Sequence, residues 1–506
     1  MKDNTRINVI VNLVRTLVLT LLSFITFPWV CRALQDSALG TYTWVMTFVS
    51  YFLIIAKIGI PNLAVRECVK VRDNKELLSN KVQALFILQG IATILSFGLM
   101  TAVVFIVPSL RDVSSIAFIL SLNFLTGAFS FEWVFIALEK QFYMSVRSIA
   151  TLSISAILTI VFVTNPGDIY IYAFISIGYT LVTSIINMVY LRKFVSLRKT
   201  LPYDFKQYIK PMLVLFSVTM VLSLYNQTDT FILGFIDPSK SQVGSYSVGI
   251  KGIDIIIGII SNLGTVFIPR SAYYYSKENK FFFKNLIKYS MNICMFIVIP
   301  AIVTMIILSK PICSLISGNT DLVGNSIGGY NDSYIVLMTL GTMMLTYSLG
   351  EIIYGQVLLP MKQEKYYLIA LLLGVLLNGA LSVVLGKFVF NEHPAIGVAI
   401  GTVLTDVLIF IFLIIKTWTW VKDALFNKNT LKLFFANIVI AGVTLGLYIL
   451  FPIIFKNLSQ TWLHVLELGV IVLIDAIIYI ALCALMKENL IYSFIKKKDE
   501  NQEITE

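Results

Sequence analysis

The stretch PAIGVAIGTVLTDVLIFIFLII, residues 394–415, decides the fold: it carries one charged residue, Asp406, and is followed at once by Lys416. A helix of about 20 such residues crosses the hydrocarbon core of a bilayer. Comparable stretches run through the whole chain of 506 residues, so we expect an all-α polytopic membrane protein with fourteen transmembrane helices. The expected spans are 8–31, 41–65, 82–107, 114–137, 142–163, 168–191, 211–235, 243–268, 289–309, 333–358, 366–386, 394–415, 433–455 and 463–486.

The lysines and arginines that separate these spans lie mainly on alternate connections. The even-numbered connections hold Arg66, Lys70, Arg72, Lys75 and Lys81; Lys140 and Arg147; Arg192, Lys193, Arg198, Lys199, Lys206 and Lys210; Arg270, Lys277, Lys280, Lys284 and Lys288; Lys362 and Lys365; and Lys416, Lys422, Lys428 and Lys432. The odd-numbered connections hold at most one cation each: Arg32, Arg111, Lys240, Lys310, Lys387 and Lys456. Because cytoplasmic loops are enriched in lysine and arginine, we expect both termini in the cytoplasm.

Composition leaves no room for a folded soluble domain. Hydrophobic residues make up 58% of the chain and charged residues 13%, the longest outward connection runs only from Lys310 to Asp332, and residues 487–506 form a polar cytoplasmic tail. The net charge of +11 follows from basic loops that face anionic lipid, so membrane lipids and not nucleic acid are the expected partners. Five scattered cysteines without C-x-x-C spacing predict neither a disulfide framework nor a metal cluster, and no cofactor is expected.

A short internal repeat organises the spans. Ala38–Thr43 (ALGTYT) opens the second span, and Gln242–Ser247 (QVGSYS) opens the eighth. Six spans separate the copies, an even number, which predicts two parallel six-helix lobes related by an axis along the membrane normal. The expected organisation is an N-terminal lobe at 1–192, a basic cytoplasmic linker at 193–210, a C-terminal lobe at 211–416, two extra helices at 417–486 and the tail at 487–506.

Several separated motifs together resemble one known family. They are Phe27–Arg32 (FPWVCR) with Leu39–Tyr42 (LGTY), Phe131–Trp133 (FEW) with Leu138–Lys140 (LEK), Asn226–Asp229 (NQTD) with Leu233–Gly234, Leu263–Arg270 (LGTVFIPR) and Val357–Pro360 (VLLP). Over about the first 420 residues the chain resembles the bacterial polysaccharide transporter family. One departure is Gln35, which follows Leu34 at a position where the family usually has glycine.

The resemblance implies both a fold and an activity. The family belongs to the multidrug/oligosaccharidyl-lipid/polysaccharide flippase superfamily, in which two six-helix lobes surround a central cavity, commonly with two extra helices. Its members are flippases for lipid-linked O-antigen, capsule and teichoic-acid repeat units in the bacterial cytoplasmic membrane. The resemblance therefore implies that this chain moves an undecaprenyl-pyrophosphate-linked oligosaccharide from the inner to the outer leaflet by alternating access. The polysaccharide polymerase machinery is a further expected partner.

Charged residues inside the spans are candidates for the transport route, because a charge at mid-bilayer costs about 2.5 to 3.5 kcal/mol on the insertion scale. Arg15 and Lys57 each lie roughly 10 to 12 Å inside the cytoplasmic ends of their spans, at about 1.5 Å per residue. Two cations at this depth suit an arriving pyrophosphate. Asn12, Thr16 and Thr20 recur at helical spacing and predict a polar cavity wall. In the other interpretation, both long cationic side chains snorkel to the interface and bind no ligand.

The second lobe carries its own set of candidates. Asn226, a further cavity-wall residue, shares one face of the seventh span with Asp229. Asp229 can accept a cation from the other lobe, bind a coupling Na⁺ or H⁺, or pair with Lys251. Lys251 is a third candidate cavity cation, but it is three residues from Asp254 and the two can neutralise each other. Glu351 lies toward the cytoplasmic side of the tenth span. A structural salt-bridge network and an ion-coupling or substrate role both remain open for these residues.

The sequence offers little support for an enzyme. It contains no G-x-x-x-x-G-K-[ST] loop and no Gly-rich dinucleotide turn, and of its two histidines, His393 and His464, neither is expected within a span. A membrane polysaccharide polymerase needs a large outward loop, and the longest one offers only Asp321 and Asp332 as acids. The remaining rival is a cation-coupled multidrug exporter of the same superfamily, which a transport assay separates from a flippase.

Overall fold

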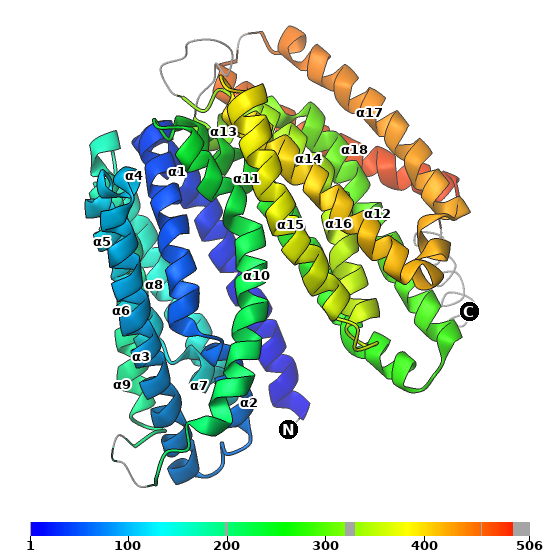
Figure 1. The fold of residues 1–506 in the computed structure, drawn as a ribbon. Helices are drawn as coiled ribbons and strands as arrows, with labels where there is room; N and C mark the ends of the chain where they lie inside the picture. Colours follow the sequence, from blue (N-terminus) through cyan, green and yellow to red (C-terminus); the bar gives the residue numbers. More distant parts are fainter. Residues whose placement is uncertain (1, 197, 199–200, 319–328, 457, 489–506) are drawn as a thin grey trace. The chain divides into compact units, whose positions relative to one another are not determined.

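The computed structural model describes residues 2–196, 198, 201–318, 329–456 and 458–488. Throughout this part the regular structure is helical and no strand occurs, as Figure 1 shows. The all-α polytopic fold predicted from the apolar stretches is therefore confirmed. Most of the C-terminal tail and the middle of the Lys310–Asp332 connection, Asp321 included, lie outside the described residues.

The chain divides into two compact units, Met1–Gly244 and Ser245–Glu506. The helices of the first unit are α1 (Lys2–Lys57), α2 (Ile60–Val69), α3 (Lys75–Ile106), α4 (Pro108–Arg111), α5 (Ser114–Ser121), α6 (Asn123–Phe129), α7 (Glu132–Ala137), α8 (Gln141–Phe162), the short 3₁₀ helix η1 (Pro166–Asp168), α9 (Ile169–Leu191) and α10 (Lys206–Ile236). The boundary falls at the start of α11 (Ser241–Ser276). The six-helix lobes expected at 1–192 and 211–416 remain a prediction.

The second unit contains the rest of α11 and the helices that follow it. These are α12 (Lys280–Ile307), α13 (Ser309–Ser317), α14 (Ser333–Ile352), the π-helical η2 (Ile353–Leu358), α15 (Lys365–Val383), the π-helical η3 (Val384–Val389), α16 (Pro394–Leu425), α17 (Lys428–Ile454) and α18 (Gln460–Leu485). In this unit α12, α14 and α16 pack on one another, α15 packs along α16, and α17 packs against both α12 and α18.

Twelve helical segments of the described chain are long and apolar enough to cross a membrane. The first of them, Val14–Val69, is not a single helix, because Gln35 interrupts α1 with φ 59° and ψ −178°. Only glycine reaches this backbone region easily, which accounts for the glycine that the resembled family usually has there. In this chain an exposed glutamine takes the strained conformation. The number of fourteen spans stays a prediction.

Helix α1 is the central element of the first unit and packs against α3, α8 and α10. Trp44, in its second half, is fully buried and donates its indole N–H to the Phe231 carbonyl of α10 at 3.0 Å. At the end of the unit where α2 and α7 lie (Figure 1), an apolar cluster that includes Ile60, Leu85 and Phe135 joins these helices to α3. Close van der Waals packing of such side chains, which holds helices together in a bilayer, fixes these helices to one another.

The equivalent glycines of the internal repeat, Gly40 and Gly244, bring two chain segments into close contact. A Cβ added to Gly40 would lie 1.8 Å from the Lys240 carbonyl oxygen, and one added to Gly244 would lie 2.2 Å from the carbonyl oxygen of Asp36. The Lys240 ammonium lies 4.1 Å from the centroid of the Trp44 ring, and burial lowers the pKa of this ammonium. At the two repeat glycines, the turn between α10 and α11 therefore packs backbone against backbone on α1, and a side chain at either position would not fit.

Candidate functional site

The fourth expected span, 114–137, is not one continuous helix. It consists of α5, α6 and α7, and between α6 and α7 Phe131 has φ 45°. A left-handed backbone at a bulky residue is costly, and such strain gathers at functional sites. The carbonyl of the preceding Ser130 accepts a hydrogen bond from the Asn187 amide on α9. The break is therefore fastened to a neighbouring helix.

Arg147 faces this break from α8. The residue is only 5% exposed, and its Nη2 lies 2.5 Å from Oε1 of Glu132, the first residue of α7. Its Nη1 donates to Oδ1 of Asn187, which also accepts the Tyr143 hydroxyl at 3.1 Å. Arg147 lies inside α8, which begins at Gln141, and inside the expected span 142–163, although it was also counted with the cations of the preceding connection. A buried guanidinium persists where a carboxylate and hydrogen bonds surround it.

Arg15 lies near the same charges. It is half-buried on α1, and Tyr179 of α9 interacts electrostatically with Arg15, Glu132 and Arg147. We call these four residues the inner charge cluster. Two cations and one carboxylate give it an excess of positive charge. Glu132 and Arg147 were not among the predicted site residues, although their positions inside apolar spans were the available signal.

Lys57, the second predicted cation, reaches the broken span at a different helix. Its Cε would lie 3.9 Å from a Cβ placed on Gly127 of α6, a few residues before the break. Lys57 is exposed, as is Thr16, whose carbonyl accepts the Thr20 hydroxyl at 2.9 Å. The side chain of Asn12 lies outside the described residues. Lys57 therefore lies close to α6, one of the two helices that the break separates.

Asp229 is buried in α10, with 6% exposure, whereas Asn226 is exposed on the same helix. One oxygen of the Asp229 carboxylate accepts the Thr230 amide at 2.7 Å, and the carboxylate interacts electrostatically with Tyr51 of α1. The residue before Tyr51, Ser50, donates its hydroxyl to the side chain of Gln227. Asp229 thus belongs to a polar contact between α1 and α10 inside the first unit.

The candidates of the second unit are paired locally. Nζ of Lys251 lies 3.9 Å from Oδ2 of Asp254, with both side chains partly exposed. On α14, the Glu351 carboxylate accepts the Tyr367 hydroxyl at 2.8 Å. Each acid therefore has a neighbour that can compensate for its placement in an apolar span. Their roles in ion coupling or substrate binding remain a prediction.

Two further acids of the second unit join neighbouring helices. The Asp406 carboxylate of α16 accepts the Thr346 hydroxyl of α14. The Asp475 carboxylate of α18 accepts the Thr444 hydroxyl of α17 at 2.7 Å. Hydrogen bonds of this kind satisfy polar groups that cannot reach water. Packing between helices accounts for both residues.

One histidine does lie within a span. His464 belongs to α18, which starts four residues earlier at Gln460, and it also lies inside the expected span 463–486, so the statement that neither histidine lies within a span is wrong. Its Nδ1 lies 3.5 Å from Oε2 of Glu467, which is 1% exposed. The pair was overlooked because it stands in the first turns of the helix, beside a polar connection.

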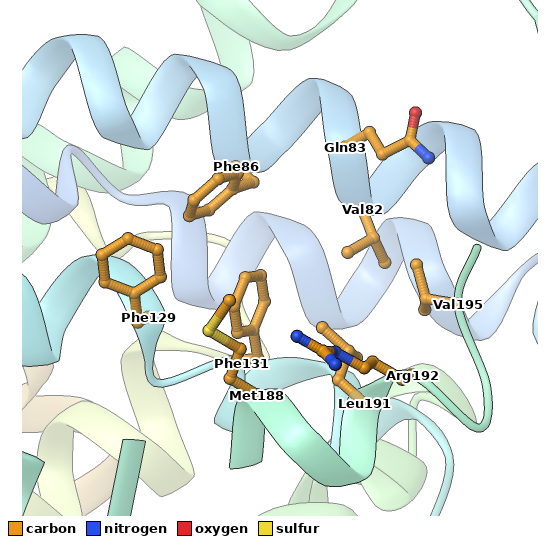
Figure 2. Close-up of a pocket in the computed structure, with 9 residues that line it drawn as sticks. All are labelled: Val82, Gln83, Phe86, Phe129, Phe131, Met188, Leu191, Arg192 and Val195. Carbon is orange, nitrogen blue, oxygen red and sulfur yellow. The ribbon is translucent and has the colours of Figure 1, made fainter. Parts of the chain in front are cut away.

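A pocket lies beside the break in the first unit (Figure 2). It is a partly open hollow with a cavity volume of about 90 Å³, between α3, α9 and the turn from α6 to α7. The residues that line it are Val82, Gln83, Phe86, Phe129, Phe131, Met188, Leu191, Arg192 and Val195. Its walls are apolar apart from Gln83 and Arg192. Phe131, the strained residue of the break, forms part of the wall.

A bundle of membrane-crossing helices with partly paired charges inside it is the arrangement of a membrane transporter. The family model described as "Polysaccharide biosynthesis protein" matches residues 6–275, more than half of the chain, and the chain belongs to this family. It is 24% identical over 402 residues to the Escherichia coli (strain K12) protein named "Putative O-antigen transporter", a match that covers 77% of this chain and 91% of that protein.

Solved structures of transporters share the fold. The lipid II flippase MurJ in an inward closed conformation matches with a TM-score of 0.69 at 16% identity, over 94% of this chain and 99% of that one. An inward-facing multidrug resistance transporter of the MATE family matches with a TM-score of 0.57 at 14% identity, over 80% and 96% of the two chains. The chain is thus a multi-pass membrane transporter of the polysaccharide biosynthesis type and not an enzyme, and the resemblance seen in its motifs is confirmed.

Proposed function

We propose that this transporter is a flippase that moves an undecaprenyl-pyrophosphate-linked oligosaccharide repeat unit, of the capsule, O-antigen or teichoic-acid type, from the inner to the outer leaflet by alternating access. The names of two similar proteins, an O-antigen transporter and a lipid II flippase, support this substrate class. The observation that carries the proposal is the inner charge cluster, which holds excess positive charge within a membrane-spanning unit.

The chemistry of the cluster suits a pyrophosphate. An anion of this size loses its hydration on leaving water, and only charged hydrogen-bond donors can replace it. Arg15, Arg147 and Lys57 supply such donors around the broken span. Glu132, whose side chain is 41% exposed, holds the guanidinium of Arg147. A pyrophosphate, like a carboxylate, offers two oxygens to a guanidinium and can therefore replace Glu132 as the partner of Arg147. Arg147 is then paired both with and without substrate.

The other candidate residues complete the proposed route. Asn12, Thr16 and Asn226 provide polar wall, and Lys251 is a further cavity cation. Asp229, Asp254 and Glu351 tune the charge of the route or couple it to an ion. The protein works in the bacterial cytoplasmic membrane with both termini in the cytoplasm, and the polysaccharide polymerase machinery uses its product.

A cation-coupled multidrug exporter is the second candidate function, since a MATE transporter shares the fold. The net charge at the candidate site distinguishes a cation exporter from a flippase with an anionic substrate. An exporter of organic cations needs excess negative charge at its site, whereas here Glu132 pairs with Arg147 and a second guanidinium, that of Arg15, acts on the same tyrosine, Tyr179. This favours an anionic substrate. A membrane polysaccharide polymerase is the weaker alternative.

A transport assay on the purified protein tests the proposal. Proteoliposomes would be loaded with a lipid-linked oligosaccharide in one sample and a cationic dye in another, with protein-free liposomes as the control. We expect the oligosaccharide headgroup to become accessible on the opposite leaflet only where protein is present, and the dye not to move. Transport of the dye without the lipid-linked oligosaccharide would establish the exporter instead.

A further inference from the structure

The pocket of Figure 2 combines an apolar interior with one basic group at its edge. Phe86, Phe129 and Phe131 form one wall and Val82 and Leu191 another. The three rings pack together, with Phe86 centred 5.5 Å from Phe129 and 5.2 Å from Phe131. Such a lining cannot satisfy a sugar, a nucleotide or any other polar ligand. It suits a hydrocarbon chain.

The pocket opens on the apolar outer surface of the unit. Met188, one of its lining residues, is 37% exposed, and Ile87, Ile185 and Val189 on the two flanking helices are exposed large hydrophobic residues. Exposed side chains of this kind on a membrane-spanning helix face lipid. A chain from the surrounding bilayer can therefore enter without passing through the inner charge cluster.

Arg192 stands where a lipid headgroup would lie. It follows Leu191, the last residue of both α9 and the apolar span that contains it, so it is placed at the membrane boundary. Figure 2 shows its guanidinium directed along the pocket toward Met188 and Phe131. Among the described residues no hydrogen bond or ion pair engages its side chain, whereas Arg72 pairs with Glu139 at 2.6 Å. A guanidinium at the membrane boundary can bind a lipid phosphate through charge-assisted hydrogen bonds.

The pocket is held open by hydrogen bonds that do not depend on a ligand. Nε2 of Gln83 donates to the Ser196 carbonyl at 2.5 Å, and its Oε1 accepts the Tyr203 hydroxyl at 2.7 Å. These bonds fix the segment after α9 across α3 and keep Val195 buried as the pocket floor. A preformed apolar site with one charged group at its edge is the usual form of a specific lipid or small-molecule site.

We propose that this pocket binds one acyl chain of an anionic membrane phospholipid, with Arg192 contacting its phosphate. The proposed ligand is a phospholipid of the bilayer, and the transported lipid is the alternative that the test below distinguishes. The proposal does not rest on the flippase function proposed above. Since Phe131 lines the pocket and Glu132 follows it, an occupied pocket supports the strained turn that presents Glu132 to Arg147.

Photocrosslinking of the full-length protein in nanodiscs tests the site. Phosphatidylglycerol with a diazirine midway along one acyl chain would be compared with the phosphatidylcholine analogue, and the crosslinked residues mapped by mass spectrometry. We expect phosphatidylglycerol to label the segments around Phe86 and Met188. Arg192→Gln should reduce this labelling about tenfold, the effect of losing one charge-assisted hydrogen bond. Met188→Trp, at the partly exposed mouth, should block labelling by both lipids.

Lys193→Gln is the matched control, because it removes the same charge at the next residue, where Lys193 lies over the Tyr190 ring and does not line the pocket. Its labelling should equal that of the wild type. Equal labelling in Arg192→Gln and Lys193→Gln would overturn the proposal, as would equal labelling by the two phospholipids. Displacement of phosphatidylglycerol by a stoichiometric amount of polyprenyl phosphate would also overturn it, since the pocket would then belong to the transported lipid. None of these outcomes depends on transport activity.

Discussion

At the residue scale, the ion pair between Arg147 and Glu132 links the strained turn at Phe131 to the excess positive charge of the inner cluster. The guanidinium side chain is 2% exposed and the carboxylate side chain 41% exposed, so the two partners differ in their access to water. The loss in unfolding free energy of the protein is therefore expected to depend on which of the two residues is replaced.

Removing the carboxylate should destabilise the protein more than removing the guanidinium. Glu132→Ala leaves a buried, unpaired cation, and the unfolding free energy is expected to fall by about 3 kcal/mol. Arg147→Met leaves a carboxylate that water can reach, so its loss should be smaller. The double substitution Glu132→Leu with Arg147→Met should regain part of the stability, because buried pairs are often replaced by apolar residues at little cost. Thermal unfolding in detergent measures all three.

The exposed pair of Arg72 and Glu139 provides the control. These side chains are 30% and 60% exposed, and Glu139 raises the pKa of the Arg72 guanidinium. Exposed pairs contribute about 0 to 1 kcal/mol, so Glu139→Ala should change the unfolding temperature little. If Glu132→Ala and Glu139→Ala lowered the unfolding temperature by the same amount, the Arg147–Glu132 pair would not be buried as described.

The predicted cavity cations are tested by export. If Arg15 and Lys57 bind the pyrophosphate, Arg15→Ala and Lys57→Ala should abolish export of the polysaccharide at normal protein abundance. Arg15→Lys should keep part of it, since a lysine retains the charge but not the bidentate geometry. Glycan at the cell surface and protein in the membrane would be quantified together. Full export in both alanine variants would mean that the two side chains only snorkel to the interface.

The sequence shows which charged residues lie inside apolar spans, but it does not show which residues pair with them. Arg15 and Lys57 stand out because each interrupts an apolar run, and the structure places Lys57 close to Gly127 of the broken span. Arg147 was counted with the cations of a connection because it lies close to Lys140 and the start of its span. Its partner could not be predicted, since the contact depends on a break at Phe131 that no hydrophobic periodicity encodes.

At the element scale, Gly40 tests the close crossing of α1 by the turn between α10 and α11. A Cβ at this position would overlap the backbone of Lys240, which cannot move aside like a flexible side chain. We expect Gly40→Ala to lower the unfolding free energy by at least about 2 kcal/mol. The matched control is Gly98→Ala in α3, where a Cβ meets nothing within 4 Å and the helix should gain about 1 kcal/mol. Unfolding temperatures that fall equally in the two variants would contradict the crossing.

Apolar patterning predicts where helices lie but not how they bend. The expected span 394–415 lies within α16, and 142–163 differs from α8 by a single residue at each end. The interruption of α1 at Gln35 falls in the predicted connection between spans 8–31 and 41–65. The break at Phe131 within 114–137 was not predicted, because it depends on a positive φ angle at a residue other than glycine. A phenylalanine gives no local signal for such a conformation, which the packing around it imposes.

At the scale of the whole molecule, the alternation of cations predicts the topology. Reporter fusions after Lys428 and after Lys199, which lies outside the described residues, should report cytoplasm. Fusions after Lys240 and Lys387 should report the outside. A cytoplasmic signal at Lys240 would remove the basis for two parallel lobes, since the repeat copies would then no longer start on the same side.

The central claim is that the transported group is an anion, and the membrane potential tests it. Outward movement across an inside-negative membrane is favourable by about 2.3 kcal/mol per charge per 100 mV. A doubly charged pyrophosphate therefore gains about 4 to 5 kcal/mol, and the same field favours return of an empty cationic cavity. Asp229, in the contact between α1 and α10, would then tune the cavity and not carry an obligatory ion.

The most direct measurement is the outward flipping rate of a lipid-linked oligosaccharide in proteoliposomes under an imposed potential. The rate should rise with inside-negative potential and stop when the potential collapses, even with a pH or Na⁺ gradient imposed, and Asp229→Asn should slow flipping without stopping it. Flipping that an ion gradient sustains at zero potential, and that Asp229→Asn abolishes, would contradict the account and make Asp229 the coupling site.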